Sequence, residues 1–382
     1  MSSDGSRWIF PAMPAPYHSR TMEKKPAATA PEPYGLTRRA ACRTPVIMSS
    51  RDQTGRVVAL TGAAEFLGRE LCNRLLHDPG CRKVLIIDVR EPALSSPKIE
   101  YIPIDLTLPN AGRELEAVFA RFRVDTLVHQ AFLSHPIHDL DYAHELQVIG
   151  TLHLLHAATS NGLRKVIMEG STMVYGARPD NPNFITEDAE LRGIPDCPQV
   201  ADLIAAEKAL WEYAARSPQT TVTCLRLASM LGRNSDGFMI RMLSHPLVPT
   251  VLGFDPLVQF VHESDALEAL WLALQRDAPG AFNIAGDGVV PLSVAIRCAG
   301  RLPLPIPHGL TDRLGGFLWT CQLSDTPAAL FDYLRYLWVT DTARARSVLG
   351  FAPRFTSLQA LQNFAALHRM LPQRPIGTGE RP

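Results

Sequence analysis

The sequence predicts an α/β fold in which a doubly wound, parallel sheet is covered by helices on both faces. Short apolar runs rich in β-branched residues, such as residues 56–60 and 83–87, alternate with segments of helical spacing, such as residues 69–77. This alternation is typical of strands joined by crossover helices. The runs are continuously apolar, as expected of parallel strands buried on both faces.

The composition indicates a globular protein with a sizeable core. Of the 382 residues, 46% are hydrophobic and 20% are charged. The 38 basic residues balance the 38 acidic ones, so bulk charge favours neither nucleic acid nor anionic membrane as a partner. No apolar run reaches the roughly 18 residues of a membrane span. The 7 cysteines show no CxxC spacing, and no metal site is expected. An odd number of cysteines without a disulfide framework suits a reducing compartment, so we expect a cytoplasmic protein.

The chain divides into four segments by composition. Residues 1–54 are rich in Pro, Ala, Ser and Arg without periodicity, which predicts a disordered extension, and Met48 would serve as an alternative start. We expect one α/β domain over residues 55–235. Residues 236–372 are expected to form mainly a second, smaller lobe, with strands that return to the sheet. Residues 373–382 are expected to be a flexible tail.

The first strand is followed by a glycine turn. Residues 61–68 read Thr-Gly-Ala-Ala-Glu-Phe-Leu-Gly, and a helical segment comes next. Gly62 allows a tight turn, and Gly68 lets the helix pack close to the sheet. The free N–H groups at the start of the helix then suit a pyrophosphate. Glu65 stands where a glycine would let the backbone approach the phosphates, and its carboxylate opposes their charge.

An acidic residue ends the second strand. Asp88 lies 20 positions after Gly68, where a carboxylate accepts hydrogen bonds from the adenosine ribose. It repels a 2′-phosphate, so NAD is favoured over NADP. Arg90 keeps NADP as the minor alternative. A strand, a glycine turn, a helix and a strand that ends in an acid together predict dinucleotide binding.

Later segments add a family signature. Asp105-Leu106 follows the run 101–104, residues 124–131 form an apolar strand that ends in His-Gln-Ala, and residues 164–176 end in Ser-Thr-Met-Val-Tyr-Gly. With the glycine turn, these segments resemble the extended short-chain dehydrogenases/reductases, the family of UDP-glucose 4-epimerase and nucleotide-sugar dehydratases. The resemblance extends over residues 56–371.

The resemblance implies a Rossmann-type fold with a smaller C-terminal substrate-binding lobe. It implies NAD as cofactor, a nucleotide sugar as substrate, and a homodimer formed through helices within residues 140–160 and 201–215. Ser171 takes the place of the catalytic Ser/Thr. The residues expected to hold the cofactor are Gly62, Ala63, Phe66, Leu67, Gly68, Asp88, Val89, Arg90, Asp105, Leu106, Gln130, Ala131, Phe132 and Lys208.

The catalytic Tyr-x-x-x-Lys of the family is incomplete. In the family, lysine binds the nicotinamide ribose and lowers the pKa of the tyrosine, which transfers the proton. The sequence around residue 208 aligns Lys208 with the lysine of this motif, so Lys208 joins Ser171 as a predicted catalytic residue. Ile204 then stands at the tyrosine position and cannot carry a proton. Asp202 and Glu207 are the two candidate substitutes, although Glu207 is expected to face elsewhere.

Several polar residues are expected to have structural roles. Arg226, Asp265 and Asn283 belong to family motifs, and we expect them to brace loops rather than contact substrate. His129 lies on a buried strand and is expected to be a hydrogen-bonded core histidine.

Three functions remain open at this point. The first is an NAD-dependent epimerase or dehydratase of nucleotide sugars that is slow because the tyrosine is missing. The second is a pseudoenzyme that keeps the cofactor site and has a sensing or interaction role. The third is a reductase of a hydrophobic carbonyl substrate, which the apolar residues 302–304 and 317–319 would suit.

Overall fold

The computed structural model describes residues 55–195, 197–321 and 326–370. The predicted N-terminal extension (residues 1–54) and C-terminal tail (residues 373–382) lie outside the described residues. A seven-stranded parallel sheet forms the centre, in the order β11-β6-β5-β4-β1-β2-β3. Its strands are β1 (Arg56–Thr61), β2 (Cys81–Ile87), β3 (Ile99–Ile102), β4 (Thr126–His129), β5 (Lys165–Ser171), β6 (Thr221–Leu227) and β11 (Gly280–Ile284).

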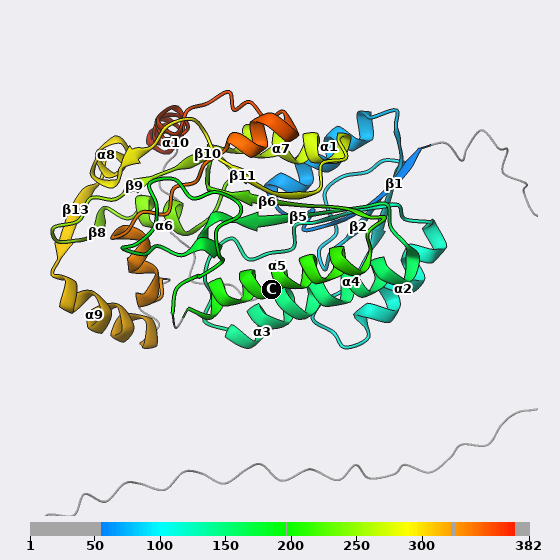
Figure 1. Cartoon of the computed structure of the whole chain (residues 1–382), viewed down its shortest axis with the longest axis horizontal. Coiled ribbons are helices and arrows are strands. Elements are labelled where there is room, and N and C mark those ends of the chain that lie inside the picture. The colour runs from blue at the N-terminus through cyan, green and yellow to red at the C-terminus, as the bar shows by residue number, and fades with distance from the viewer. Residues whose placement is uncertain (1–54, 196, 322–325, 371–382) are drawn as a thin grey trace, which may run out of the picture. The chain divides into compact units, whose positions relative to one another are not determined.

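Helices cover both faces of this sheet, which confirms the predicted doubly wound fold (Figure 1). One face carries α2 (Ala111–Phe122), α4 (Gly150–Asn161) and α5 (Pro198–Arg216), and the other carries α1 (Phe66–His77) and α7 (Glu263–Gln275). Leu67, Leu71 and Leu75 of α1 recur every four residues and are buried against the sheet. Among the described residues, no helix is long and apolar enough to span a membrane.

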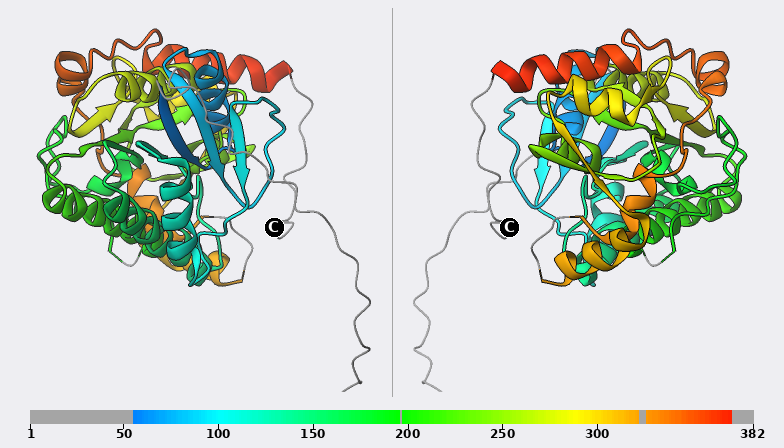
Figure 2. Two further views of the ribbon diagram at one scale, coloured as in Figure 1. Left: turned by 90° about the vertical axis from the view of Figure 1, so that its right-hand side faces the viewer. Right: turned by 90° about the vertical axis from the view of Figure 1, so that its left-hand side faces the viewer.

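The second half of the chain builds a smaller lobe beside the carboxyl ends of the strands. It contains α6 (Phe238–Ser244), a parallel pair of strands β8 (Leu247–Val251) and β13 (Leu302–Ile306), α8 (Leu292–Cys298) and α9 (His308–Thr320). The last helix, α10 (Ser357–Met370), packs on α8 and on the strand β10 (Phe260–His262). Seen from both ends of the molecule, α10 and α4 lie on opposite sides of the sheet (Figure 2).

The strand order reverses beside β1. From β1 the chain first builds outward to β2 and β3, and it then returns to β4, on the other side of β1, and continues toward β11. The loops after β1 and β4 therefore leave the sheet in opposite directions. A crevice forms between them at the carboxyl ends of the strands, where open α/β sheets bind their ligands.

Candidate active site

The glycine turn after β1 lies against the end of β4. Gly62 has a φ of 73°, and a Cβ placed on it would lie 2.5 Å from the backbone oxygen of Gln130. A Cβ on Gly68 would collide with the backbone oxygen of Gly62. The space at both positions therefore requires glycine, and the turn brings the start of α1 into the crevice.

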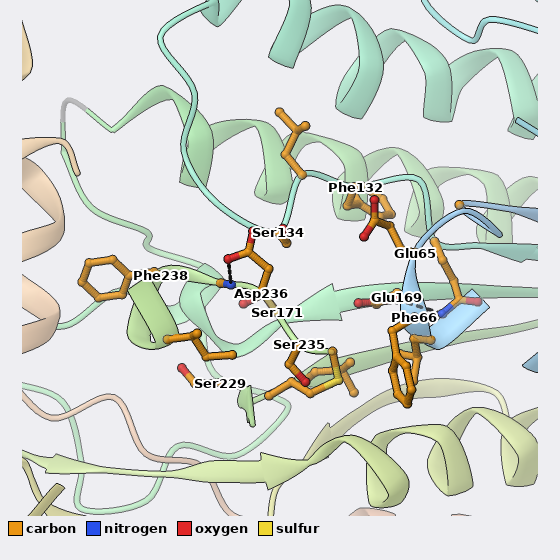
Figure 3. Close-up of a pocket in the computed structure, with 18 of the residues that line it drawn as sticks. Glu65, Phe66, Phe132, Ser134, Glu169, Ser171, Ser229, Ser235, Asp236 and Phe238 are labelled. Carbon is orange, nitrogen blue, oxygen red and sulfur yellow. Dashed lines mark hydrogen bonds between the residues drawn. The ribbon is translucent and has the colours of Figure 1, made fainter. Parts of the chain in front are cut away.

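Two cavities meet at this turn, and both are lined by Gly62, Glu65, Gln130, Phe132 and Leu133. The first, the adenosine-side cavity, is also lined by the predicted residues Asp88, Val89, Arg90, Asp105, Leu106 and Ala131. The second, the Ser171 cavity, is also lined by Phe66, Leu67, Gly68 and Ser171 (Figure 3). Of the predicted site residues, Ala63 is buried in the core and lines neither cavity.

Glu65 lines both cavities and is paired with an arginine. Its carboxylate forms an ion pair with Arg90, with 3.1 Å between Oε1 and Nη2, and both side chains are about two-thirds exposed, at 63% for Glu65 and 67% for Arg90. The Oδ2 of Asp88 accepts a hydrogen bond from the Ala64 backbone N–H at 3.2 Å. Arg90 therefore offsets the charge that Glu65 brings to the phosphate side, while Asp88 fixes the turn.

The end of β5 supplies two polar side chains to the Ser171 cavity. Glu169 and Ser171 are two positions apart on the strand and so face the same side. Gln130 Nε2 donates a hydrogen bond to Glu169 Oε2 at 2.9 Å. Burial raises the pKa of Glu169 to about 7, the hydrogen bond from Gln130 opposes this rise, and the charge of Glu65 adds to it.

Sequence reasoning missed Glu169. The available signal was an acid at the end of a strand that is otherwise apolar from Val166 to Met168. Family motifs drew attention to Ser171 instead, and only the folded chain brings Gln130 of the neighbouring strand against the carboxylate.

The position of Lys208 corrects the prediction for α5. Lys208 is exposed and lines neither cavity, so the structure does not bring it together with Ser171. Its neighbour Glu207 is buried and accepts hydrogen bonds from Arg226, with 3.0 Å between Nε and Oε1. This buried ion pair fixes the rotation of the helix and turns Lys208 to solvent.

Leu203, one turn before Glu207, is the residue of α5 that lines the Ser171 cavity. Ile204 is 9% exposed and belongs to the core of the smaller lobe. If the cavity-facing residue takes the place of the lysine, the Tyr-x-x-x-Lys spacing puts Gln199 in the place of the tyrosine. In this register both the tyrosine and the lysine of the motif are replaced, and the apparent match of Lys208 to the motif is a coincidence of spacing.

The other two candidate bases are also engaged elsewhere. The Oδ1 of Asp202 accepts a hydrogen bond from His144 Nδ1 at 2.8 Å. The expectation that Glu207 faces away from the cavity is confirmed by its pairing with Arg226. Arg226 also donates to the Tyr175 hydroxyl and to the Glu187 backbone oxygen, and this agrees with the bracing role expected for it.

His129 is a buried core histidine, as expected from its strand. Its ring nitrogens lie 2.8 Å from Thr61 Oγ1 and 2.9 Å from Thr151 Oγ1. Burial lowers its pKa to about 3, so it stays neutral. Among the described residues, no group of three or more His, Cys, Asp or Glu side chains could hold a metal ion.

The wall of the Ser171 cavity is apolar and carries negative charge. Its apolar residues are Phe66, Leu67, Phe132, Leu133, Met173, Leu203, Leu227, Ala228, Met230, Phe238, Met239 and Ile240. Of the described residues that line it, Glu65, Glu169 and Asp236 are acidic, and none is Lys, Arg or Tyr. Burial alone would raise the pKa of Asp236, but hydrogen bonds from His135 and Arg241 outweigh it and hold the pKa well below its usual range.

Comparisons with known proteins agree with this architecture. The model of the NAD dependent epimerase/dehydratase family matches residues 58–285. An uncharacterised protein of Mycobacterium tuberculosis is 34% identical over 328 residues, which are 83% of this chain and 85% of that protein. A 3-diazoavenalumate denitrifying reductase of a Streptomyces species is 27% identical over 56% of this chain and 68% of its own.

A solved structure with the same fold is the dTDP-glucose 4,6-dehydratase of Streptomyces venezuelae, determined with NAD and TYD bound. It superimposes with a TM-score of 0.64 at 19% identity and covers 82% of this chain and 97% of its own. The family match spans more than half of the chain and includes the glycine turn, the end of β5 and the start of α7. On these grounds the chain belongs to the NAD dependent epimerase/dehydratase family.

Proposed function

We propose that this protein binds NAD and carries out slow, NAD-dependent hydride transfer of the epimerase/dehydratase type. The observation that carries the proposal is the pair of cavities that meet at Gly62, with Asp88 at one end and Ser171 at the other. This arrangement suits a dinucleotide whose ribose is held at Asp88 and whose reactive ring lies near Ser171.

The residues present fit this cofactor. Gly62 and Gly68 keep the turn open and place the start of α1 beside it, where N–H groups suit a pyrophosphate. Gln130 is 5% exposed, and its Oε1 atom is buried with no hydrogen-bond partner among the described residues. A buried acceptor of this kind suits a donor such as a carboxamide N–H. When bound, NAD supplies the hydride acceptor.

The side chains around the cavity would position the substrate and exclude water. Ser171 offers a hydroxyl that can hydrogen-bond a substrate hydroxyl or carbonyl, and Phe132 and Leu133 keep water from the reacting atoms. The tyrosine that transfers the proton in the family has no counterpart in either register of α5. General acid–base catalysis contributes about 100- to 10,000-fold, which sets the scale of the expected loss.

The substrate class has two candidates. Sequence similarity to UDP-glucose 4-epimerases supports a nucleotide sugar as substrate here, in keeping with the family. The second candidate is reduction of an apolar substrate without phosphate groups. It is favoured by the apolar wall of the Ser171 cavity, which among the described lining residues has no Lys or Arg to pair with a diphosphate, and by the similarity to a denitrifying reductase.

We also propose a homodimer that forms through the helices around residues 140–160 and 201–215. Leu152 of α4 supports this, because it is apolar and 44% exposed on the outer surface of that layer. Sedimentation velocity tests the dimer, and a monomer at micromolar concentration contradicts it. A cytoplasmic location is also proposed, because the 7 scattered cysteines suit a reducing compartment.

Calorimetric titration of the nucleotide-free protein with NAD, NADH and NADPH tests the cofactor. We expect NAD and NADH to bind, and NADPH to bind more weakly because Asp88 repels the 2′-phosphate. Absence of binding in a folded sample would contradict the proposal and favour a pseudoenzyme that acts through partners. The NAD-loaded protein is then incubated with UDP-glucose, with dTDP-glucose and with apolar aldehydes and ketones, while the nicotinamide absorbance is recorded.

A further inference from the structure

Glu169 is an ionisable side chain of the Ser171 cavity that the family motifs do not account for. It ends the apolar part of β5 and lines the Ser171 cavity (Figure 3). It lies on the same side of the strand as Ser171 and beside Gln130, on the part of the wall assigned to the nicotinamide. A carboxyl group at this position is within the space where substrate and cofactor would react.

Gln130 can stabilise Glu169 in both protonation states. Its Nε2 donates to the carboxylate at 2.9 Å, while its buried Oε1 has no partner among the described residues. A half-turn of the amide presents Oε1 instead, which can accept a hydrogen bond from the protonated acid. This rotation exchanges donor and acceptor, so Glu169 finds a hydrogen-bond partner in Gln130 in either protonation state.

The charged groups around Glu169 do not neutralise it. On β4, His129 is neutral because burial lowers its pKa to about 3. On β6, Arg226 is paired with Glu207 of α5. In the glycine turn, Glu65 is negative and raises the pKa of Glu169 further.

Across the cavity, Asp236 is held by His135 and Arg241. Burial therefore acts on Glu169 without a counter-cation on the described cavity wall and brings its pKa to about 7.

We propose that Glu169 is the redox-linked proton acceptor of this site, ionised beside oxidised nicotinamide and protonated beside reduced nicotinamide. The inference rests on the proposed function. When a substrate alcohol is oxidised, its C–H hydrogen leaves with two electrons as hydride to NAD⁺, and its O–H proton passes to the Glu169 carboxylate, directly or through the Ser171 hydroxyl. Reduction of a carbonyl returns both, so charge and atoms balance in each direction.

The physical reason is the charge of the ring. Oxidised nicotinamide is positive and favours the carboxylate, which lowers the pKa of Glu169. Reduced nicotinamide is neutral and adds further burial, which raises it. At pH 7 a group of pKa about 7 is half protonated, so binding of NAD⁺ releases, and binding of NADH takes up, at most about 0.5 proton per site.

Calorimetry in buffers of different ionisation enthalpy measures this proton exchange and needs no substrate. We expect release with NAD⁺ and uptake with NADH at pH 7. The ratio of the Kd for NADH to the Kd for NAD⁺ should rise about sevenfold from pH 6 to pH 8.5, for a difference of one pKa unit between the two complexes. Glu169→Gln should abolish both the proton exchange and the pH dependence. Asp236→Asn, which alters an acid in the same cavity that stays ionised, should keep them.

Three results overturn the inference. One is equal proton exchange for NAD⁺ and NADH in the unaltered protein, which stands even if Glu169→Gln fails to fold. Another is an unequal exchange that persists in folded Glu169→Gln, because another group then carries the proton. In both cases cofactor binding, and with it the proposed function, survives. Failure of both cofactors to bind overturns the inference and the proposed function together.

Discussion

The glycine turn and helix α5 contribute to neighbouring cavities, but their sequences differ in how well they predict geometry. At the turn, Gly62 and Gly68 are only six residues apart. A Cβ on Gly62 would clash with the backbone of Gln130, and a Cβ on Gly68 would clash with the backbone of Gly62. In α5, the orientation is set by Glu207, whose partner Arg226 lies 19 residues away on a strand. Local spacing was therefore sufficient for the turn, whereas a tertiary ion pair decides which face of α5 lines the cavity.

Removal of Glu207 tests that comparison with the largest expected effect. Glu207→Ala leaves Arg226 charged in the core, since Arg226 is 4% exposed. Loss of one partner from a buried pair costs about 3–5 kcal/mol. Urea unfolding of the full chain measures the change in the free energy of unfolding. Glu212→Ala, an exposed change one turn further along α5, is the matched control and should stay within about 0.5 kcal/mol. Equal effects of the two substitutions would mean that the ion pair does not fix the helix.

Much of the fold could be predicted because its signals are periodic or local. The continuous apolar runs predict parallel strands, and the position of Asp88 after Gly68 predicts the second strand's end. The site near Ser171 was less predictable. Lys208 matches the family motif but faces solvent, and Glu169 acquires its environment only when the fold buries it beside Gln130, which follows the neighbouring strand β4. Sequence spacing gives no measure of such contacts between elements.

Ile204→Tyr separates the two registers of α5 directly. The sequence alone suggests that it would restore the missing proton donor. In the structure, Ile204 packs in the smaller lobe, and its Cδ1 would lie 2.8 Å from a Cβ on Gly193. We therefore expect overpacking that costs about 1–3 kcal/mol in urea unfolding. Gln199→Tyr, at a half-buried position one turn before Leu203, is the control and should change the free energy of unfolding less. A fully stable Ile204→Tyr with improved hydride transfer would support the sequence-based register.

Glu65→Gln examines the glycine-turn side, with a smaller effect. The substitution removes an acid from the phosphate side and frees Arg90, to which Glu65 is paired. Because both side chains are largely exposed, water and salt screen the charge, and we expect a gain in NAD affinity of about threefold at low salt. NADPH should gain more than NAD, since the freed Arg90 can meet a 2′-phosphate. Glu70→Gln, on the next turn of α1, makes the same charge change and should alter the affinity for neither NAD nor NADPH. A gain that is unaffected by 0.5 M salt would exclude the electrostatic explanation.

Lys208→Ala is expected to have the smallest effect, and this makes it the sharpest test of the difference between the turn and the helix. By its motif letters Lys208 would bind the nicotinamide ribose, and its loss would weaken NAD binding by at least tenfold. In the structure it faces solvent while Leu203 lines the cavity, so NAD affinity should change by less than twofold and stability by less than about 0.5 kcal/mol. Calorimetry with NAD on both proteins measures the first quantity. A tenfold loss would mean that α5 rotates when the cofactor binds, and the Glu207–Arg226 pair would then have to break and re-form in each binding event.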